Sequence, residues 1–357
     1  MTPGIATVAD NRFLRACRGE PVDATPVWFM RQAGRSLSEY RAIRERASLV
    51  EITRDAALCA EVTLQPVRRL GVDAAILFAD ITTPLPGLGV DYRIEDGIGP
   101  VVGRPIRTAV DVMSLRPFIA AETVPALLDA IRLVRDASPV PLIGFAGAPF
   151  TLACYLVEGR PSRDFLTVKA MLHEDPELFA ALMSRLVTMT LDYLRAQVDA
   201  GVQAVQVFDS WVGGLSPLDY RVAVQPHMRR LFDGLAALGV PTIHFGTVTA
   251  GLLSAMADAG GDVIGVDWRI DLADARRMVP GRAVQGNLDP ALLLGPFGAV
   301  EAHARWILGQ VGSEPGHVFN LGHGVLPATD PDHLRRLVAL VHEVSSVPSP
   351  VLERSAP

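Results

Sequence analysis

Short apolar segments recur along the chain, separated by longer segments with helical periodicity. Eight of the short segments are rich in β-branched or other apolar residues, and they are apolar at most positions rather than at alternate positions. Such runs are typical of strands buried on both faces of a parallel sheet. The predicted strands span residues 25–30, 73–80, 140–147, 204–210, 241–246, 262–268, 282–287 and 317–324.

The segments between these strands mostly carry apolar residues at helical spacing. Ser48-Leu-Val-Glu51 is a capping box, and it predicts a helix that runs toward Arg69 and ends at Gly71. Further helical patterns lie within residues 125–137, 161–200, 217–239, 250–261, 271–279, 298–312 and 331–344.

Eight strands alternating with helices predict an α/β fold, a (β/α)8 barrel of the TIM type, with residues 1–357 as a single domain. The length alone would also allow two average domains. The structural alternative is a doubly wound open sheet. Such a sheet usually has a glycine-rich first turn for a nucleotide, and none follows residues 25–30.

Two segments depart from this alternation. Residues 88–102 alternate in polarity and contain Asp96-Gly97, which predicts a β-hairpin excursion after the second strand rather than a separate domain. The Ser- and Pro-rich tail, from about residue 346 to residue 357, is predicted to be disordered.

Composition narrows the range of functions. Of 357 residues, 49% are hydrophobic and 20% charged, which is ordinary soluble composition. No apolar run approaches the ~18 residues of a membrane helix, and the N-terminus lacks a signal-peptide core, so we expect a cytoplasmic protein with no membrane partner. The net charge of −6 argues against a nucleic-acid partner. Cys17, Cys59 and Cys154 form no CxxC pair and suggest neither a disulfide framework nor a cysteine zinc site.

Lysine is nearly absent from the sequence. Lys169 is the only one, so arginine carries almost all the positive charge. Schiff-base aldolases and pyridoxal enzymes need a lysine in the active site. Lys169 lies in a segment with a helical pattern, and these classes are therefore nearly excluded.

Polar side chains follow the predicted strands at their carboxyl ends, where barrels of this type hold their chemistry. Arg31 and Arg35 follow the first strand at once, with Gly34 between them to allow a close approach of the backbone. The other strand ends supply Asp80, Phe145, Asp209, Ser210, His244, Asp267, Asn287, Asn320 and His323. Tyr155 is expected in the loop after the third strand.

Each of these residues also has a purely structural interpretation. An aspartate after a strand, such as Asp209 or Asp267, is more often a helix cap or loop residue. His244 is more often a hydrogen-bonded core histidine than a base. Arg31 and Arg35 have helical spacing and could form a solvated face. Their place directly after a buried strand favours an anion site instead.

Several long segments resemble the uroporphyrinogen decarboxylase family. Residues 26–41 (PVWFMRQAGRSLSEYR) and 144–159 (GFAGAPFTLACYLVEG) are similar to its two signatures. Similar stretches occur at 64–81, 205–217, 265–276, 284–290 and 320–327, so the resemblance covers essentially the whole chain. Ser36 and Ser38 replace the family's usual Tyr and Pro, which could loosen the turn after the arginines.

The resemblance implies a barrel enzyme, usually a homodimer, that needs no cofactor. The sequence has no His/Cys/Glu cluster with metal-ligand spacing, so we also expect no metal. The family removes carbon dioxide from the four acetate side chains of uroporphyrinogen III to give coproporphyrinogen III, in haem and related tetrapyrrole synthesis. Matched residue by residue, it implies that the tetrapyrrole substrate contacts Arg31, Gln32, Ala33, Gly34, Arg35, Asp80, Tyr155, Ser210 and His323. Phe145 could add an apolar wall.

The chemistry of this reaction suits these residue types. Arginine pairs bidentately with carboxylates, of which the substrate has eight. Without a cofactor, the electron sink must be a protonated pyrrole, and the carboxylate of Asp80 could stabilise that cation. The proton donor stays open among Arg31, a water molecule and a substrate carboxylic acid, because the high pKa of arginine makes it a poor acid.

Two rival functions remain at this point. A barrel methyltransferase of the same superfamily would hold zinc with a His-x-Cys pair and a distant Cys, but here Phe245 and Gly246 follow His244. A non-catalytic tetrapyrrole carrier would need the same pocket. Asp80 and both arginines argue only weakly against a carrier, because a carrier must also bind.

Overall fold

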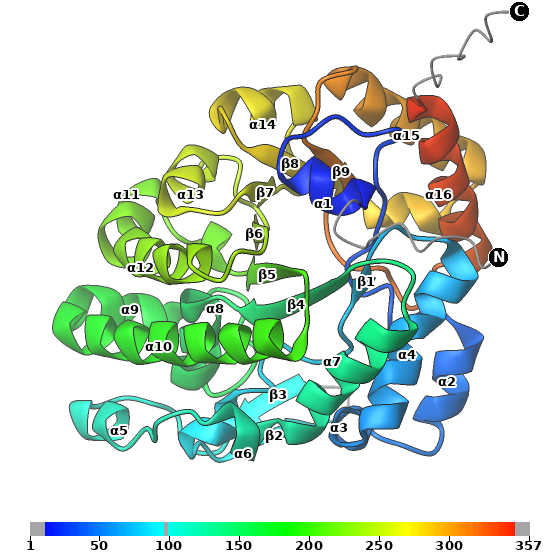
Figure 1. The fold of residues 1–357 in the computed structure, drawn as a ribbon. Coiled ribbons are helices and arrows are strands. Elements are labelled where there is room, and N and C mark those ends of the chain that lie inside the picture. The colour runs from blue at the N-terminus through cyan, green and yellow to red at the C-terminus, as the bar shows by residue number, and fades with distance from the viewer. Residues whose placement is uncertain (1–10, 96–98, 347–357) are drawn as a thin grey trace, which may run out of the picture.

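A ring of parallel strands surrounded by helices forms the centre of the molecule (Figure 1). The structure, a computed structural model, describes residues 11–95 and 99–346. Within these residues, one parallel sheet follows the chain order β1-β4-β5-β6-β7-β8-β9, as expected for a barrel of the TIM type. Its strands are β1 Ala75–Ile76, β4 Leu142–Gly147, β5 Ala204–Asp209, β6 Thr242–Gly246, β7 Val263–Gly265, β8 Ala283–Leu288 and β9 His317–Leu321.

The first predicted strand, residues 25–30, completes the ring between β9 and β1 without becoming a regular strand. It forms one isolated parallel bridge, from Val27 to Phe319. On its other side, the N–H of Asp73 donates to the carbonyl of Val27 over 2.8 Å. The segment therefore has its predicted place in the barrel, but the prediction of a full strand is wrong.

Side chains explain why this segment is irregular. The N–H of Val27 donates to Asp73 Oδ2 at 2.7 Å, and the N–H of Met30 donates to Asn320 Oδ1 at 3.1 Å. These amide groups are hydrogen-bonded to side chains, so they are not available to a neighbouring strand.

The second predicted strand, residues 73–80, is regular only at Ala75 and Ile76. At Phe78 the backbone turns to a neighbouring helix: its N–H donates to Thr63 Oγ1, and its carbonyl accepts from Cys59 Sγ. The side chains of the helix thus replace a strand partner at this point.

The capping box confirms the predicted helix start at Ser48, but the helix is interrupted. It divides into α3 (Leu49–Arg54) and α4 (Ala56–Leu70). Asp55 between them is extended, and its Oδ1 accepts from the N–H groups of Ala57 and Leu58 at 2.9 and 3.0 Å. Asp55 is therefore the cap that begins a second helix. Gly71 ends α4 in the left-handed conformation, as predicted.

The other predicted helices are present, although their bounds differ and two of the predicted segments divide. They are α7 Pro125–Ala137, α9 Leu166–Glu174, α10 Pro176–Ala200, α11 Pro217–Asp219, α12 Gln225–Ala236, α13 Leu253–Ala259, α14 Leu272–Met278, α15 Phe297–Val311 and α16 Pro331–Ser345. The structure adds helices that the pattern did not predict: α1 Arg12–Cys17, α2 Ser38–Arg44, α5 Ala109–Met113, α6 Ala120–Thr123 and α8 Pro149–Glu158.

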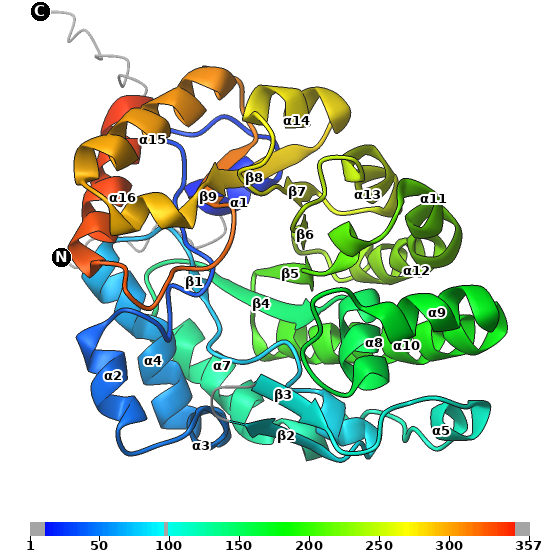
Figure 2. The same ribbon diagram turned by 180° about the vertical axis from the view of Figure 1, so that it is seen from behind.

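The predicted hairpin excursion is confirmed. Strands β2 (Tyr92–Glu95) and β3 (Gly99–Val102) pair antiparallel, and Figure 2 shows them below α7 and beside α3. The predicted turn at Asp96-Gly97 and nearly all of the predicted disordered tail, residues 347–357, lie outside the described residues.

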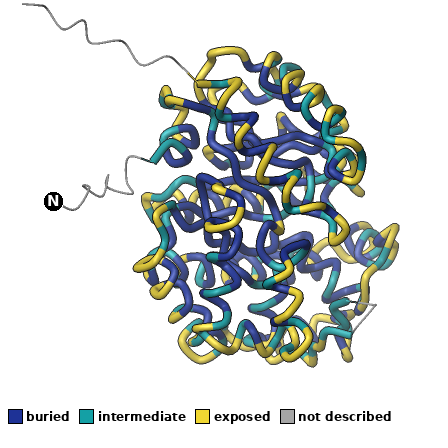
Figure 3. The backbone as a smooth tube through the Cα atoms, turned by 90° about the vertical axis from the view of Figure 1, so that its right-hand side faces the viewer, coloured by how far each residue is buried: buried dark blue, intermediate teal, exposed yellow. Residues whose placement is uncertain are grey.

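Buried backbone runs through the middle of the molecule, and exposed backbone gathers on its outer helices and loops (Figure 3). Helix α1 packs against β8 and β9. No helix in the described part of the chain is both long and apolar enough to cross a membrane.

Candidate active site

A cleft opens at the carboxyl ends of the barrel strands. It is lined by the turn after residues 25–30, by the segment after β1, by the ends of β4, β5 and β6, by α8, and by the loop after β9. Nine of the ten predicted site residues line it: Arg31, Ala33, Gly34, Arg35, Asp80, Phe145, Tyr155, Ser210 and His323. The tenth, Gln32, does not.

A tight turn presents the two arginines to this cleft. Arg31 has a φ of +61° and Gly34 a φ of +85°, so the backbone is left-handed at both positions. A Cβ at Gly34 would lie 2.4 Å from a ring carbon of Phe78. The turn therefore requires a glycine there, both for its backbone conformation and for the space against Phe78.

Gln32 holds this turn in place from below. Its side chain is 1% exposed; Oε1 accepts from the N–H of Phe29 at 3.0 Å, and Nε2 donates to the carbonyl of Ala74 at 2.9 Å. Its amide is thus used within the protein, and it ties the turn to the start of β1.

The side chains of Arg31 and Arg35 are not paired within the described part of the chain. Neither guanidinium makes a hydrogen bond or ion pair with any residue in the described ranges, and Arg31 is exposed. Burial, followed by the charge of Arg31, lowers the pKa of Arg35 from its ordinary value. Two guanidiniums that repel each other and have no ion-pair partner among the described residues are suited to an anionic ligand.

Asp80 lies between the cleft and the turn that follows β1. Its Oδ1 accepts from the N–H of Thr82 at 2.9 Å and from the Thr82 hydroxyl. Its Oδ2 has no hydrogen-bond partner among the described residues. One carboxylate oxygen is therefore held by the protein, and the other is free for a ligand.

Tyr155 lies on α8, not in a loop as the strand-end interpretation supposed. Its ring packs against Trp211, with centroids 4.1 Å apart, and Trp211 stacks on Phe165 at 4.8 Å. Burial, followed by the charge of Asp80, raises the pKa of Tyr155, so its hydroxyl stays protonated and can donate.

His323 is neutral at physiological pH. Burial lowers its pKa to about 4, and the charges of Arg31, Arg35 and Arg269 act in the same direction. Neutral imidazole offers one donor and one acceptor beside the arginines, rather than a third positive charge.

An apolar wall faces these polar groups. Phe145 meets Phe208 edge to face at 5.4 Å, and Phe208 meets Phe245 at 5.8 Å, also edge to face. Sequence reasoning found Phe145 but missed Phe208 and Phe245. The alternation along β5 could have found Phe208, because Phe208 and Ser210 line the cleft, whereas Asp209 between them does not.

The remaining strand-end residues do not line the cleft. Asp209 accepts from the Thr151 hydroxyl at 3.2 Å, and Asp267 accepts from the N–H of Val248 at 2.6 Å. Asn287 donates to carbonyls of the loop after β7, and Asn320 accepts from backbone N–H groups.

His244 is a core residue, as predicted, but the predicted hydrogen bonds of its imidazole are absent among the described residues. Its imidazole is fully buried, and neither nitrogen has a hydrogen-bond partner among the described residues. Its Nε2 lies 3.6 Å from Asp209 Oδ2.

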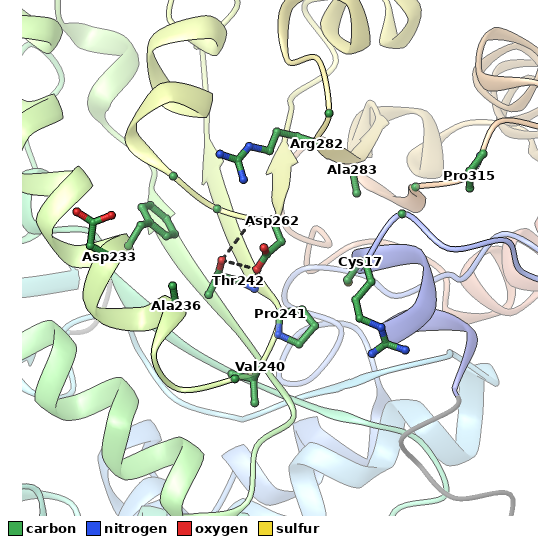
Figure 4. A pocket seen from close by; sticks show the side chains of 18 of the residues that line it. Cys17, Asp233, Ala236, Val240, Pro241, Thr242, Asp262, Arg282, Ala283 and Pro315 are labelled. Carbon is green, nitrogen blue, oxygen red and sulfur yellow. Dashed lines mark hydrogen bonds between the residues drawn. The ribbon is translucent and has the colours of Figure 1, made fainter.

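A wider hollow lies at the opposite end of the barrel (Figure 4). It is lined near the starts of β6, β7 and β8, by Thr242, Asp262 and Ala283 among others. Asp262 Oδ2 accepts from both the N–H and the hydroxyl of Thr242 at 2.8 Å, so this carboxylate is occupied. No predicted site residue lines this hollow.

The fold and the cleft define a barrel enzyme with a site for an anionic, partly apolar ligand at the carboxyl ends of its strands. The sequence profile described as "Uroporphyrinogen decarboxylase (URO-D)" matches residues 8–344. The chain belongs to the uroporphyrinogen decarboxylase family.

Relatives with this description match along nearly their full length. The uroporphyrinogen decarboxylase of Salinispora tropica is 57% identical over 343 residues, covering 96% of this chain and 92% of that protein. The uroporphyrinogen decarboxylase of a Thermus thermophilus strain is 53% identical over 339 residues, covering 95% of this chain and 99% of that protein.

Solved structures share the fold. A methyltransferase from Methanosarcina mazei superposes with a TM-score of 0.80 at 22% identity, covering 93% of this chain and 97% of that chain. A B12-independent methionine synthase from Shewanella sp. W3-18-1 reaches a TM-score of 0.55 at 12% identity, covering 84% and 89%. At such identities the likeness concerns the fold alone.

Proposed function

We propose that this chain is a carboxy-lyase that removes the acetate carboxyl groups of uroporphyrinogen III to give coproporphyrinogen III, in tetrapyrrole synthesis. The observation that carries the proposal is the meeting of Arg31, Arg35 and Asp80 in one cleft, in a chain of this family. A single barrel domain, a cytoplasmic location and a homodimer accompany the proposal as expectations from the family.

The cleft suggests how the substrate is held. Arg31 and Arg35 pair with carboxylates of the tetrapyrrole, and the unpaired state of both guanidiniums among the described residues supports this role. Tyr155, Ser210 and His323 hydrogen-bond further carboxylates. The wall of Phe145, Phe208 and Phe245 packs against the apolar part of the macrocycle. Gln32 acts by positioning the turn.

The bond cleavage requires a place for the electron pair of the departing carboxylate. A pyrrole protonated on carbon accepts that pair, carbon dioxide leaves, a proton adds to the methylene carbon to complete the methyl group, and the ring carbon loses the proton it had gained. Across the whole step, one proton is consumed for each carbon dioxide released. The free Oδ2 of Asp80 accepts hydrogen bonds from pyrrole N–H groups and stabilises the cation in a partly buried site.

The residues of the cleft support a reaction without a pyridoxal cofactor. Lys169, the sole lysine of the sequence, lies on α9, and its Nζ donates to the carbonyl of Asp164 at 3.3 Å. It does not line the cleft. The electron sink we propose therefore belongs to the substrate.

The deciding experiment is anaerobic incubation of the purified protein with uroporphyrinogen III, followed by chromatography of the products. We expect stepwise loss of four carboxyl groups. Tight binding without product would instead favour the tetrapyrrole carrier. Loss of turnover after exhaustive chelation, restored by zinc, would favour chemistry of the methyltransferase type.

A further inference from the structure

A second cavity adjoins the substrate cleft at Asp80. This rear cavity is bounded by α3, by β2, by Pro86 and by residues 122–127. Asp80 lines both spaces, so its carboxylate lies in the wall between them. Tyr92 lines the rear cavity and not the cleft. Asp80 can therefore be approached from the rear cavity as well as from the cleft.

A chain of hydroxyl groups crosses this wall. The phenol of Tyr92 is hydrogen-bonded to the hydroxyl of Thr82, and the hydroxyl of Thr82 is hydrogen-bonded to Asp80 Oδ1. An ionised carboxylate can only accept, so Thr82 donates its proton to Asp80. Tyr92 must then donate to Thr82. The direction of hydrogen-bond donation is thus determined: Tyr92 donates to Thr82, and Thr82 donates to Asp80.

The reaction needs what such a chain can supply. Each decarboxylation consumes one proton, and four occur on one substrate. A tetrapyrrole held by Arg31 and Arg35 would occupy the mouth through which water could otherwise reach Asp80. The Tyr92 oxygen keeps its lone pairs, because the hydroxyl uses only its proton on Thr82, and Tyr92 lines the rear cavity, where water can enter.

We propose that Tyr92 and Thr82 form a proton-transfer chain that carries protons from water in the rear cavity to Asp80, and that Asp80 then protonates the substrate. This inference rests on the proposed function. A proton binds to the oxygen of Tyr92, the hydrogen of Tyr92 moves to Thr82, and that of Thr82 moves to Asp80. Rotation of the two hydroxyls afterwards restores the starting arrangement.

The resulting step balances. The O–H formed at Asp80 Oδ1 turns into the cleft by rotation of the carboxyl group, transfers its proton to a pyrrole carbon, and leaves a carboxylate facing the cation it has created. The bond between the acetate methylene and its carboxylate breaks, its electron pair neutralises the ring, and carbon dioxide leaves. A proton is then added to the methylene carbon, and the ring carbon returns its own. The net uptake is the single proton that entered at Tyr92.

The surroundings of Tyr92 agree with transfer through a neutral phenol. Burial, followed by the charge of Asp80, raises the pKa of Tyr92 from its ordinary value. The phenol therefore stays protonated at neutral pH and conducts by exchanging hydrogens rather than by ionising. Orientation of Asp80 alone would not need Tyr92, because the N–H of Thr82 already holds Oδ1 at 2.9 Å.

The test compares variants of the two hydroxyl residues in the full chain. Tyr92→Phe keeps the ring and removes the hydroxyl; we expect kcat for uroporphyrinogen III to fall about ten- to a hundredfold with little change in KM. The solvent deuterium isotope effect on kcat should rise, and imidazolium buffer should accelerate the variant but not the wild type. Thr82→Val should behave in the same way, Thr82→Ser should stay near wild type, and the double variant should be no slower than either single one.

Tyr193→Phe is the matched control. The Tyr193 hydroxyl is buried and has no hydrogen-bond partner in residues 11–95 and 99–346, so its removal should change neither kcat nor the isotope effect. Wild-type kcat in folded Tyr92→Phe would overturn the inference. A lower kcat with an unchanged isotope effect and no acceleration by buffer would also overturn it, because that outcome describes positioning only.

The outcomes separate this inference from the proposed function. A wild-type protein that releases no carbon dioxide from uroporphyrinogen III would overturn both. An active wild type with unaffected hydroxyl variants would overturn the transfer chain alone. If Tyr92→Phe does not fold, Thr82→Val against Thr82→Ser decides the question with the same measurements.

Discussion

At the scale of the residue, the cleft combines two arginines that form no ion pair within the described residues with groups that remain neutral. Arg31 and Arg35 have no ion-pair partner among the described residues, whereas His323 and Tyr155 keep neutral side chains. A ligand that supplies several carboxylates would complete this arrangement.

Asp80→Asn should lower kcat far more than it changes substrate binding. The amide is nearly isosteric, but it has no charge to stabilise a protonated pyrrole. The loss is expected to cost ~3–4 kcal/mol, or about a hundred- to thousandfold in rate. Asp80→Glu keeps the charge and should retain more activity than Asn. Steady-state turnover of uroporphyrinogen III measures both.

The alternative role of Asp80 is to cap the turn through the N–H of Thr82, and asparagine can do this almost equally well. Asp55→Asn is the control, because Asp55 only caps α4. Near-normal turnover by a folded Asp80→Asn variant would leave Asp80 as a cap alone.

Arg35→Ala should weaken apparent substrate affinity about ten- to a hundredfold while the fold stays intact. A lost charge-assisted pair is worth ~1.5–3 kcal/mol, and Arg35 makes no ion pair within the described chain that its removal would break. Arg31→Lys should also be harmful, because an ammonium group does not replace a planar fork. Titration of substrate into inactive Asp80→Asn protein, with and without the arginine change, gives the affinities.

Arg132→Ala is the matched control for surface charge, since Arg132 is exposed and pairs with Asp129 on α7. Equal affinities for Arg35→Ala and Arg132→Ala would make Arg35 an ordinary surface residue.

At this scale the sequence predicted residue types well and side-chain directions poorly. The arginines, Asp80 and His323 follow strands closely, so their place at the carboxyl ends was visible. Asp209 ends β5 and His244 lies in the middle of β6, but neither lines the cleft. For Asp209, only the alternation from Phe208 to Ser210 could have indicated this. The partners of Gln32 lie on other elements and were not predictable.

At the scale of the element, the turn after residues 25–30 determines where the arginines lie. Its shape depends on Gly34, which combines a positive φ with a close approach to Phe78. The α3–α4 break, by contrast, depends on one capping side chain, Asp55, within a continuous apolar pattern. The periodicity predicts the helical content of such a segment, but a single hydrogen-bonding residue decides where it divides.

Gly34→Ala should displace the arginine turn and reduce substrate affinity. The added Cβ would meet Phe78 at 2.4 Å, so the turn must move. Gly71→Ala is the control: its φ of +71° carries similar backbone strain, of order 1 kcal/mol, but nothing lies within 4 Å of the added carbon.

Both glycine variants should lose some stability in denaturant titrations, and only Gly34→Ala should also raise KM. Equal KM values for the two would show that the turn tolerates the displacement.

At the scale of the whole molecule, the barrel could be predicted because eight apolar segments alternate with helices. The closure of the barrel could not be predicted, because it depends on side chains from distant parts of the chain. Asp73 accepts from Val27 at 2.7 Å, from His342 at 2.7 Å and from Arg12 at 3.3 Å. One carboxylate thus joins the start of β1, the first segment of the ring, α1 and α16.

Asp73→Ala should destabilise the protein by about 3–5 kcal/mol. The change leaves a buried N–H without its acceptor and breaks a largely buried ionic cluster, whose carboxylate side chain is 11% exposed. Asp129→Ala, which removes an exposed pair, should cost at most about 1 kcal/mol. Urea unfolding curves of both variants make the comparison. Similar costs would show that backbone pairing alone closes the barrel.

The way the ring closes also determines when, during synthesis on the ribosome, the protein becomes competent. Residues 25–30 and the arginine turn emerge long before the partners of this segment, Phe319, Asn320 and Ser345. A nascent chain can assemble most of its strands and helices and still lack the closed first segment of the ring. The arginine turn then lacks its closing contacts until α16 has emerged, so decarboxylation should begin only after that point and not in proportion to the length synthesised.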